Sequence, residues 1–124
     1  MSRLKIEAGG VSFEIELTNG PTAQALAAAV PFESRAQTWG EEVYFSTPIS
    51  AKLEPGAKQV VEPGTVCFWT QGDSLALPFG RTPISTDGRP KLANPCSILG
   101  RIVGDPVLLA KVRSGDKVRV TSAK

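Results

Sequence analysis

The sequence predicts a mainly β protein, a mostly antiparallel barrel of about seven or eight strands capped by two short helices. Three observations support this fold class. Apolar and polar residues alternate with a period of two over several short stretches, as expected of half-buried strands. Turn residues separate these stretches, since 12 Gly and 10 Pro are spread over 124 residues. The regular alternation of strands and helices that forms a parallel sheet is missing.

A tight hairpin over residues 3–17 is the clearest element. Apolar and charged residues alternate on both sides of Gly9 and Gly10, and both glycines accept the positive φ of a type I′ turn. The register that this turn imposes places Arg3 opposite Glu16, and such pairs of opposite charge support strand pairing. The apolar residues then share the other face, towards a core.

An Ala-rich stretch that follows predicts a helix of about nine residues. Pro21 suits the first helical turn, and Pro31 ends the helix. Leu26 and Val30 lie four positions apart, so they share one face that packs on the sheet.

The middle of the chain predicts a strand and a second hairpin. The strand is centred on Val43 and Phe45, which share one face. Residues 49–64 form a loop between two Pro-Gly turn signals. Residues 65–70 and 75–79 form the hairpin.

The remaining residues predict a long loop, a strand, a short helix and a final strand. Residues 80–97 contain three prolines and no periodicity, and a loop of this length is commonly functional or mobile. A strand follows over residues 98–103. Asp105 and the proline after it begin a helix that Gly115 stops, and residues 117–121 close the chain as a strand.

The composition excludes several classes of function. Apolar residues make up 41% and charged residues 21%, without repeats or linkers, so we expect one globular domain over residues 1–124. A net charge of +2 is too small for a nucleic-acid surface. The absence of histidine excludes Ser-His and Cys-His catalysis and histidine-ligated metals. We therefore expect no metal and no cofactor.

The two cysteines, Cys67 and Cys96, have no metal-binding or redox spacing. We expect them to be small buried apolar residues in a reducing compartment. Residues 1–10 lack the continuous apolar segment of a secretory signal, and no stretch approaches the roughly 18 apolar residues of a membrane span. The sequence therefore predicts a cytoplasmic protein without a membrane partner.

Enzyme signatures such as a P-loop or a G-x-S-x-G motif are absent, so only local groups of residues remain as candidates. Glu41 and Glu42 lie beside Trp39 and Tyr44. Adjacent carboxylates can raise each other's pKa, as general acid catalysis requires. Neighbours in a strand point to opposite faces, however, so a solvated strand end is the favoured interpretation of this pair.

Aromatic residues of the second hairpin form another candidate. Phe68 and Trp69 are adjacent, so one of them faces away from whatever the other packs on. An outward tryptophan suits an apolar or proline-like group, and a core role and a groove role both stay open for Trp69.

Arg81 lies in a Gly-flanked turn directly after this hairpin. There its guanidinium can donate to a carbonyl or carboxylate, although a solvated loop arginine is the commoner outcome. Arg35 and Arg101 are weaker candidates.

Five segments occur together in an order that is typical of one family, and the Thr-Trp-Gly-Glu-Glu block at residues 38–42 is the most specific of them. They cover residues 31–34, 38–48, 68–69, 79–83 and 98–102. In these segments the sequence resembles the small bacterial and archaeal cyclophilin-like proteins. The resemblance implies a closed eight-stranded antiparallel barrel capped by two short helices.

The resemblance also bears on function. Cyclophilins isomerise Xaa-Pro bonds with an arginine and a proline pocket, which requires no metal or cofactor, but their Phe-His-Arg segment has no counterpart here. We therefore predict a groove on the outer barrel wall that binds a peptide, a proline-containing segment or a small molecule. The alternatives are an isomerase that uses Arg81 or Arg101, and a non-catalytic interaction domain. The predicted groove residues are Phe45, Trp69, Phe79 and Arg81, with Glu42 and Tyr44 at the rim.

Overall fold

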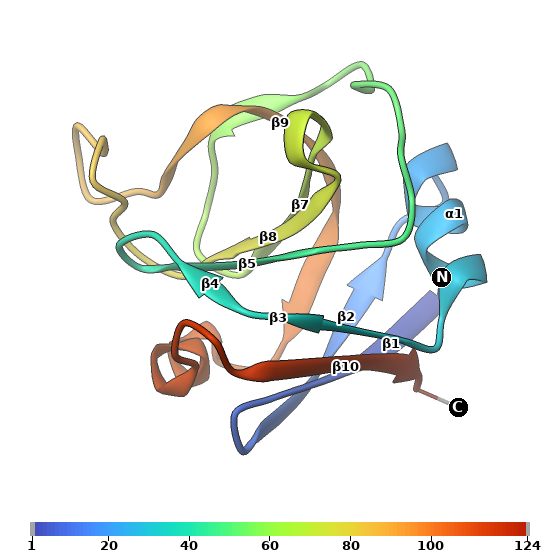
Figure 1. Ribbon diagram of the computed structural model, residues 1–124. Helices are drawn as coiled ribbons and strands as arrows, with labels where there is room; N and C mark the ends of the chain where they lie inside the picture. The colour runs from blue at the N-terminus through green and yellow to red at the C-terminus, as the bar shows by residue number, and fades with distance from the viewer. Residues whose placement is uncertain (1, 124) are drawn as a thin grey trace.

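In the computed structural model, which describes residues 2–123, ten strands form an antiparallel sheet that curls into a nearly closed barrel (Figure 1). The mainly β barrel class is confirmed. The described elements are, in chain order, β1 (Ser2–Ala8), β2 (Val11–Leu17), α1 (Pro21–Ala29), β3 (Phe32–Arg35), β4 (Gln37–Thr38), β5 (Glu42–Ser46), β6 (Lys58–Val60), β7 (Thr65–Trp69), the 3₁₀ helix η1 (Thr70–Gly72), β8 (Ser74–Pro78), β9 (Lys91–Val103), the 3₁₀ helix η2 (Pro106–Lys111) and β10 (Lys117–Ser122).

The barrel is closed by a chain connection, because the strands at the two ends of the sheet are consecutive in the sequence. The strand order is β3-β10-β1-β2-β9-β7-β8-β5-β4, with β6 paired to β9. The two ends of this path, β3 and β4, are joined by Ala36 alone. Near the seam, Ser34 Oγ and Ser46 Oγ lie 3.1 Å apart. The described residues form ten strands rather than the predicted eight. The two additional strands arise because β3 and β4 are the halves of one bent strand and because β6, with only three residues, is counted separately.

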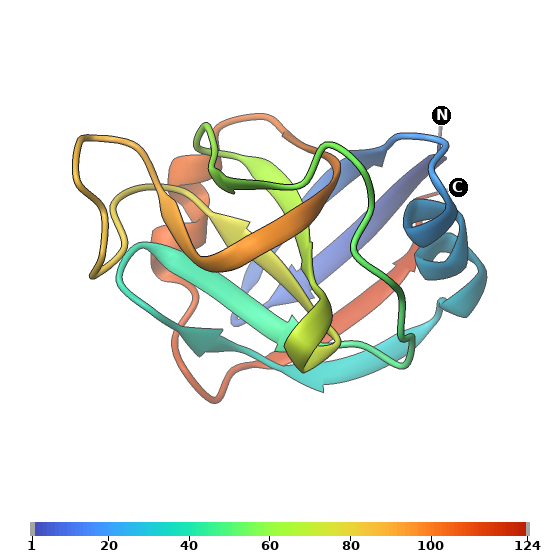
Figure 2. The same ribbon diagram turned by 90° about the horizontal axis from the view of Figure 1, so that it is seen from above.

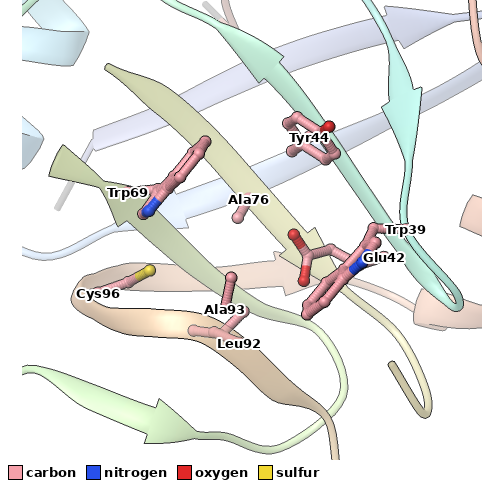
Figure 3. Close-up of a pocket in the computed structure, with 8 residues that line it drawn as sticks. All are labelled: Trp39, Glu42, Tyr44, Trp69, Ala76, Leu92, Ala93 and Cys96. Atoms are coloured by element: carbon pink, nitrogen blue, oxygen red, sulfur yellow. The ribbon is translucent and has the colours of Figure 1, made fainter. Parts of the chain in front are cut away.

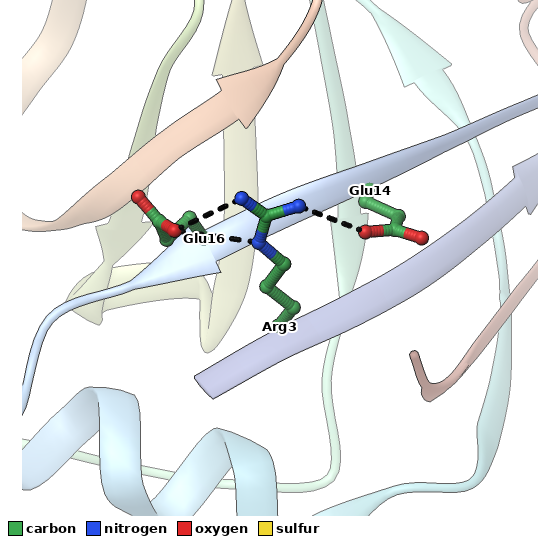
Figure 4. Close-up of polar contacts among 3 residues, drawn as sticks. All are labelled: Arg3, Glu14 and Glu16. Carbon is green, nitrogen blue, oxygen red and sulfur yellow. Dashed lines mark hydrogen bonds and ion pairs between the residues drawn. The ribbon is translucent and has the colours of Figure 1, made fainter. Parts of the chain in front are cut away.

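The first hairpin has the predicted register, with Arg3 opposite Glu16. Gly9 and Gly10 have φ values of +54° and +89°, as a type I′ turn requires. On the exposed face the Arg3 guanidinium lies 3.5 Å from the Glu14 carboxylate and 3.3 Å from that of Glu16 (Figure 4). Exposed ion pairs contribute at most about 1 kcal/mol, so the buried face stabilises this hairpin.

Helix α1 covers one end of the barrel, and the 3₁₀ helix η2 covers the opposite end (Figure 2). The first begins at Pro21 as predicted, and its Leu26 side chain is fully buried. The second is a 3₁₀ helix that ends at Lys111, earlier than predicted. Asp105 caps it as predicted, because its carboxylate accepts the N–H of Val107 at 3.0 Å.

Apolar clusters lie on both sides of the barrel wall. The larger cluster fills the interior, where β5 contributes Val43 and Phe45, each 1% exposed. The smaller cluster lies on the outside of the wall, because Cys67 on β7 and Ala76 on β8 alternate with the core residues of those strands. Its buried residues are Val61, Cys67, Ala76, Leu92 and Cys96.

The prediction of a loop over residues 80–97 is wrong at its C-terminal end. Strand β9 begins at Lys91 and continues for 13 residues. Its first half pairs with β6 and arches over the outside of the barrel, whereas its second half pairs with β7 and β2 in the wall (Figures 1 and 2). Pro95 interrupts the alternation that identifies a strand, because proline cannot donate a ladder hydrogen bond. The short strands β3, β4 and β6 were also not predicted.

Candidate pocket on the outer barrel wall

A pocket of about 240 Å³ lies between the outer barrel wall and the first half of β9 (Figure 3). Strands β5, β7 and β8 form its floor, and β9 forms the opposite side. Three of the lining residues are aromatic, one is acidic, and the others are small or apolar. They are Trp39, Glu42, Tyr44, Trp69, Ala76, Leu92, Ala93 and Cys96.

Strand alternation explains why the floor residues face outwards. On β5, Val43 and Phe45 point into the core, so Glu42 and Tyr44 between and beside them point to the other face. Ala76 on β8 lies directly opposite Tyr44 in the sheet. Because its side chain is a single methyl group, the floor is hollow at this position.

Hydrogen bonds hold the aromatic side chains in place. The Trp69 indole Nε1–H donates to Asn94 Oδ1 on β9 at 3.1 Å, which ties the wall to the arching strand. The Tyr44 hydroxyl donates to Gln37 Oε1 at 3.0 Å. The rings of Tyr44 and Trp69 meet edge to face, with centroids 6.4 Å apart and an interplanar angle of 85°. Such contacts fix the orientation of both rings.

Trp39 belongs to the turn between β4 and β5. Gly40, the next residue, has a φ of +60°, and a Cβ there would lie 2.9 Å from the carbonyl oxygen of Arg81. Glycine at this position therefore allows the tight turn that presents Trp39 to the pocket.

The arching half of β9 is anchored along its length. Gln59 Nε2 donates to the Leu92 carbonyl at 2.9 Å, and the Val61 N–H donates to the Pro90 carbonyl at 3.2 Å. The Thr82 hydroxyl also donates to the carbonyl of Lys91. These bonds hold the first half of β9 in place across the pocket from the wall.

Glu42 is the one ionisable carboxyl group of the pocket lining, and it is only 7% exposed. Figure 3 shows its carboxyl group pointing into the space that the labelled side chains enclose. Among residues 2–123, no hydrogen-bond partner lies within reach of its Oε1 atom. Burial disfavours the charged form and raises the pKa of Glu42 from 4.5 to about 7.

Both cysteines are free and buried, as predicted, and both lie near this carboxyl group. Burial, then the charge of Cys96 and that of Glu42, raise the pKa of the Cys67 thiol well above its ordinary value. Burial and then Glu42 raise the pKa of the Cys96 thiol to about 12. Both groups therefore remain neutral thiols near pH 7.

The structure brings three of the predicted groove residues together: Tyr44, Trp69 and Glu42 all line the pocket. Trp69 lies on the outer side of the wall, where it lines the pocket and also packs against the smaller apolar cluster. The favoured interpretation of Glu42 as part of a solvated strand end is wrong, because the arching β9 covers the face of β5 from which it projects.

The other predicted residues lie elsewhere. Phe45 is buried in the barrel core, and Phe79 packs against that core from its edge. Arg81 is exposed, and its guanidinium donates to the Ser85 carbonyl at 3.4 Å. Arg101 is exposed on the second half of β9, where it lines a second hollow with Lys58.

Trp39 and the β9 residues of the pocket were not among the predicted groove residues. Trp39 had a usable signal, because it lies in the specific Thr-Trp-Gly-Glu-Glu block beside two residues that were selected. Leu92, Ala93 and Cys96 had none, since they lie in a segment without strand periodicity.

Within residues 2–123, no group of three or more potential metal ligands comes together. None of the helices described for these residues has the length and apolar character needed to cross a membrane.

The matches to known proteins extend over nearly the whole chain and agree with the barrel fold. The Cyclophilin-like family model matches residues 2–121, so the chain belongs to the Cyclophilin-like family. Among solved structures, it is similar to the solution structure of a hypothetical protein from Archaeoglobus fulgidus. That chain is 37% identical with a TM-score of 0.82, and the match covers 98% of this chain and 95% of the other. No curated protein matches the sequence.

Proposed function

We propose that this Cyclophilin-like protein binds a small molecule, or a short segment of a peptide, in the pocket between the outer barrel wall and β9. One observation carries the proposal. The chain contains two Trp and one Tyr, and all three line this one pocket together with a buried carboxyl group. The five Phe residues, in contrast, belong to the barrel core or pack against it.

Tyr44 and Trp69 also pack against the smaller apolar cluster, but the presence of all three side chains in one pocket supports ligand binding. Tryptophan and tyrosine combine a large apolar surface with a polar group, and they are enriched where a surface must hold a partner. At about 240 Å³ the pocket is slightly smaller than the roughly 300–1,000 Å³ of drug-sized sites. It therefore suits a fragment-sized group.

The isomerase alternative receives less support. Catalysis of the cyclophilin type needs an arginine beside the proline pocket, whereas the eight lining residues include neither arginine nor lysine. Arg81 and Arg101 both lie outside the lining. We propose binding without isomerisation, in a cytoplasmic setting that suits two free thiols.

Intrinsic fluorescence tests binding directly, because both tryptophans of the chain line the pocket. The probes are acetyl-alanyl-prolinamide and three compounds with the same branched head: choline, 3,3-dimethylbutan-1-ol and 3,3-dimethylbutanoate. We expect at least one of them to change tryptophan emission saturably at millimolar concentrations.

A blocking variant and a matched control complete this experiment. Ala93 is exposed at the mouth of the pocket, so Ala93→Phe fills the mouth without disturbing the core. Ala110→Phe makes the same change on η2, at the end of the barrel. Binding lost in the first variant and kept in the second supports the proposal. The proposal fails if no probe binds, or if the blocked variant binds as well as the unmodified protein.

A protease-coupled assay on a proline tetrapeptide tests the alternative. We expect no acceleration over the uncatalysed isomerisation, which takes tens of seconds. Acceleration that Ala93→Phe abolishes would instead identify the protein as an isomerase that works without an arginine in its pocket.

A further inference from the structure

We propose that the ligand of this pocket carries an ammonium group with apolar substituents, and that the Glu42 carboxylate binds it as counter-ion within a ring of Trp39, Tyr44 and Trp69. This inference rests on the proposed binding function and specifies the chemistry of the ligand.

The first argument is the unsatisfied carboxyl group. A buried polar atom without a partner is unfavourable by several kcal/mol, and buried carboxylates are normally paired. Glu42 Oε1 is buried and has no partner within residues 2–123, and the Glu42 residue lines an open pocket. Positive charge or a hydrogen-bond donor in this pocket stabilises the carboxylate, whereas an anion or a purely apolar group does not.

The second argument is that nothing in the pocket competes for this role. The titratable groups that interact with Glu42 are the Cys67 thiol on β7 and the Cys96 thiol on β9, and burial keeps both of them neutral near pH 7. The Tyr44 hydroxyl donates to Gln37, and the pocket lining contains no lysine or arginine. The pocket therefore carries a negative charge whenever Glu42 is ionised.

The third argument is the aromatic lining. The face of an aromatic ring carries partial negative charge and attracts ammonium groups, most strongly when the site is desolvated. Three aromatic side chains around one carboxylate favour a cation and disfavour an anion. Because the pocket also buries apolar surface of Ala76 and Leu92, substituents on the nitrogen gain contacts as well.

The main test compares choline with 3,3-dimethylbutan-1-ol, which has the same shape without the charge. We expect the unmodified protein to bind choline at least tenfold more tightly. Glu42→Gln keeps the shape of the side chain and removes its charge, so it should reduce this preference several-fold, to the part that the aromatic rings alone supply. The matched control is Glu41→Gln, because Glu41 is exposed and lies outside the pocket lining.

A pH profile of the unmodified protein gives a second readout that does not depend on any variant. Choline stays charged at every pH, so only the protein titrates. Its affinity should rise by up to tenfold per pH unit from pH 5 towards 7 and level off above that, because burial places the pKa of Glu42 at about 7. The affinity for 3,3-dimethylbutan-1-ol should show no such rise.

The results separate this inference from the proposed function. Equal affinity for the two compounds, tighter binding of 3,3-dimethylbutanoate, or a choline affinity independent of pH overturns the inference of a cation while binding itself stands. The absence of binding by every probe overturns the proposed function and the inference together.

An ammonium group can belong to a free amine or to a lysine side chain of a peptide. We compare butylammonium with the peptide Gly-Gly-Lys-Gly-Gly, with norleucine in place of lysine as the neutral control. Tighter binding of the lysine peptide than of both others identifies a peptide side chain as the source. If butylammonium binds more tightly than the lysine peptide, the ligand is a free amine.

Discussion

Replacing Glu42 by glutamine should stabilise the protein at neutral pH, because it removes a carboxylate that burial disfavours. The side chain is 7% exposed and has no hydrogen-bond partner for its Oε1 atom within residues 2–123. Glutamine has nearly the same shape, so the change alters charge with little change in packing. The effect should depend on pH, because protonation neutralises the glutamate but leaves the glutamine as it is.

The sign and size follow from the pKa of Glu42, which burial raises from 4.5 to about 7. Between these pH values the folded state binds more protons than the unfolded state, so the free energy of unfolding falls as pH rises. One pKa unit corresponds to about 1.4 kcal/mol, which gives a total loss of about 3 kcal/mol by pH 8. Glu42→Gln should therefore match the unmodified protein near pH 5 and exceed its stability by about 2–3 kcal/mol at pH 8.

Urea unfolding at pH 5, 6, 7 and 8, followed by tryptophan emission, measures this difference. With an m value of about 1.5 kcal/mol per M, the two proteins should differ by about 1.5–2 M in midpoint at pH 8. The chain contains no histidine, so few groups other than Glu42 titrate between pH 5 and 8, and the measured difference can be assigned to Glu42. Glu7→Gln, at an exposed position on β1, is the control and should follow the unmodified protein at every pH.

A stability of the unmodified protein that stays level or rises from pH 5 to 8 would refute the reasoning. So would an equal shift in the Glu7→Gln control, because the effect would then come from net charge rather than from burial at the pocket.

Three further substitutions test the fold by urea unfolding. Gly100→Ala should destabilise the protein by more than about 3 kcal/mol, because a Cβ there would clash with the backbone carbonyl of Glu16, whereas Gly88→Ala, which meets open space, should be nearly neutral. Asp105→Ala removes the cap of η2 and should lower the free energy of unfolding by about 1 kcal/mol; an unchanged value would contradict the capping role. Leu26→Ala creates a cavity beneath α1 and should be unfavourable by about 2–5 kcal/mol, and a loss below about 1 kcal/mol would mean that α1 packs loosely on the barrel.

Elements held together by local interactions were predictable from the sequence. The hairpin at residues 3–17 has the register expected from its two glycines, because turn type and strand alternation together determine which residues pair. The start of α1 and the cap at Asp105 follow equally from short-range backbone chemistry.

Elements that depend on distant contacts were not predictable in this way. Residues 91–96 form a strand only because β6 pairs with them and the outer barrel wall supports them, and their own sequence shows no alternation. The arch that they form also decides the environment of Glu42. A strand-end glutamate is normally solvated, and here it is buried because a segment about 50 residues later in the chain covers it.

The pH dependence of stability and the preference for a cation both depend on the ionisation of Glu42, so they are thermodynamically linked. Desolvation of Glu42 makes the folded protein less stable as the carboxyl group ionises, and a bound ammonium group returns a favourable interaction to that same ionised form. A cationic ligand therefore lowers the pKa of Glu42, and saturation with such a ligand flattens the decline of stability between pH 5 and 8. A neutral ligand stabilises the folded state at every pH without flattening that decline. The shape of the stability curve with ligand present thus reports the charge of the bound group, independently of the affinity with which it binds.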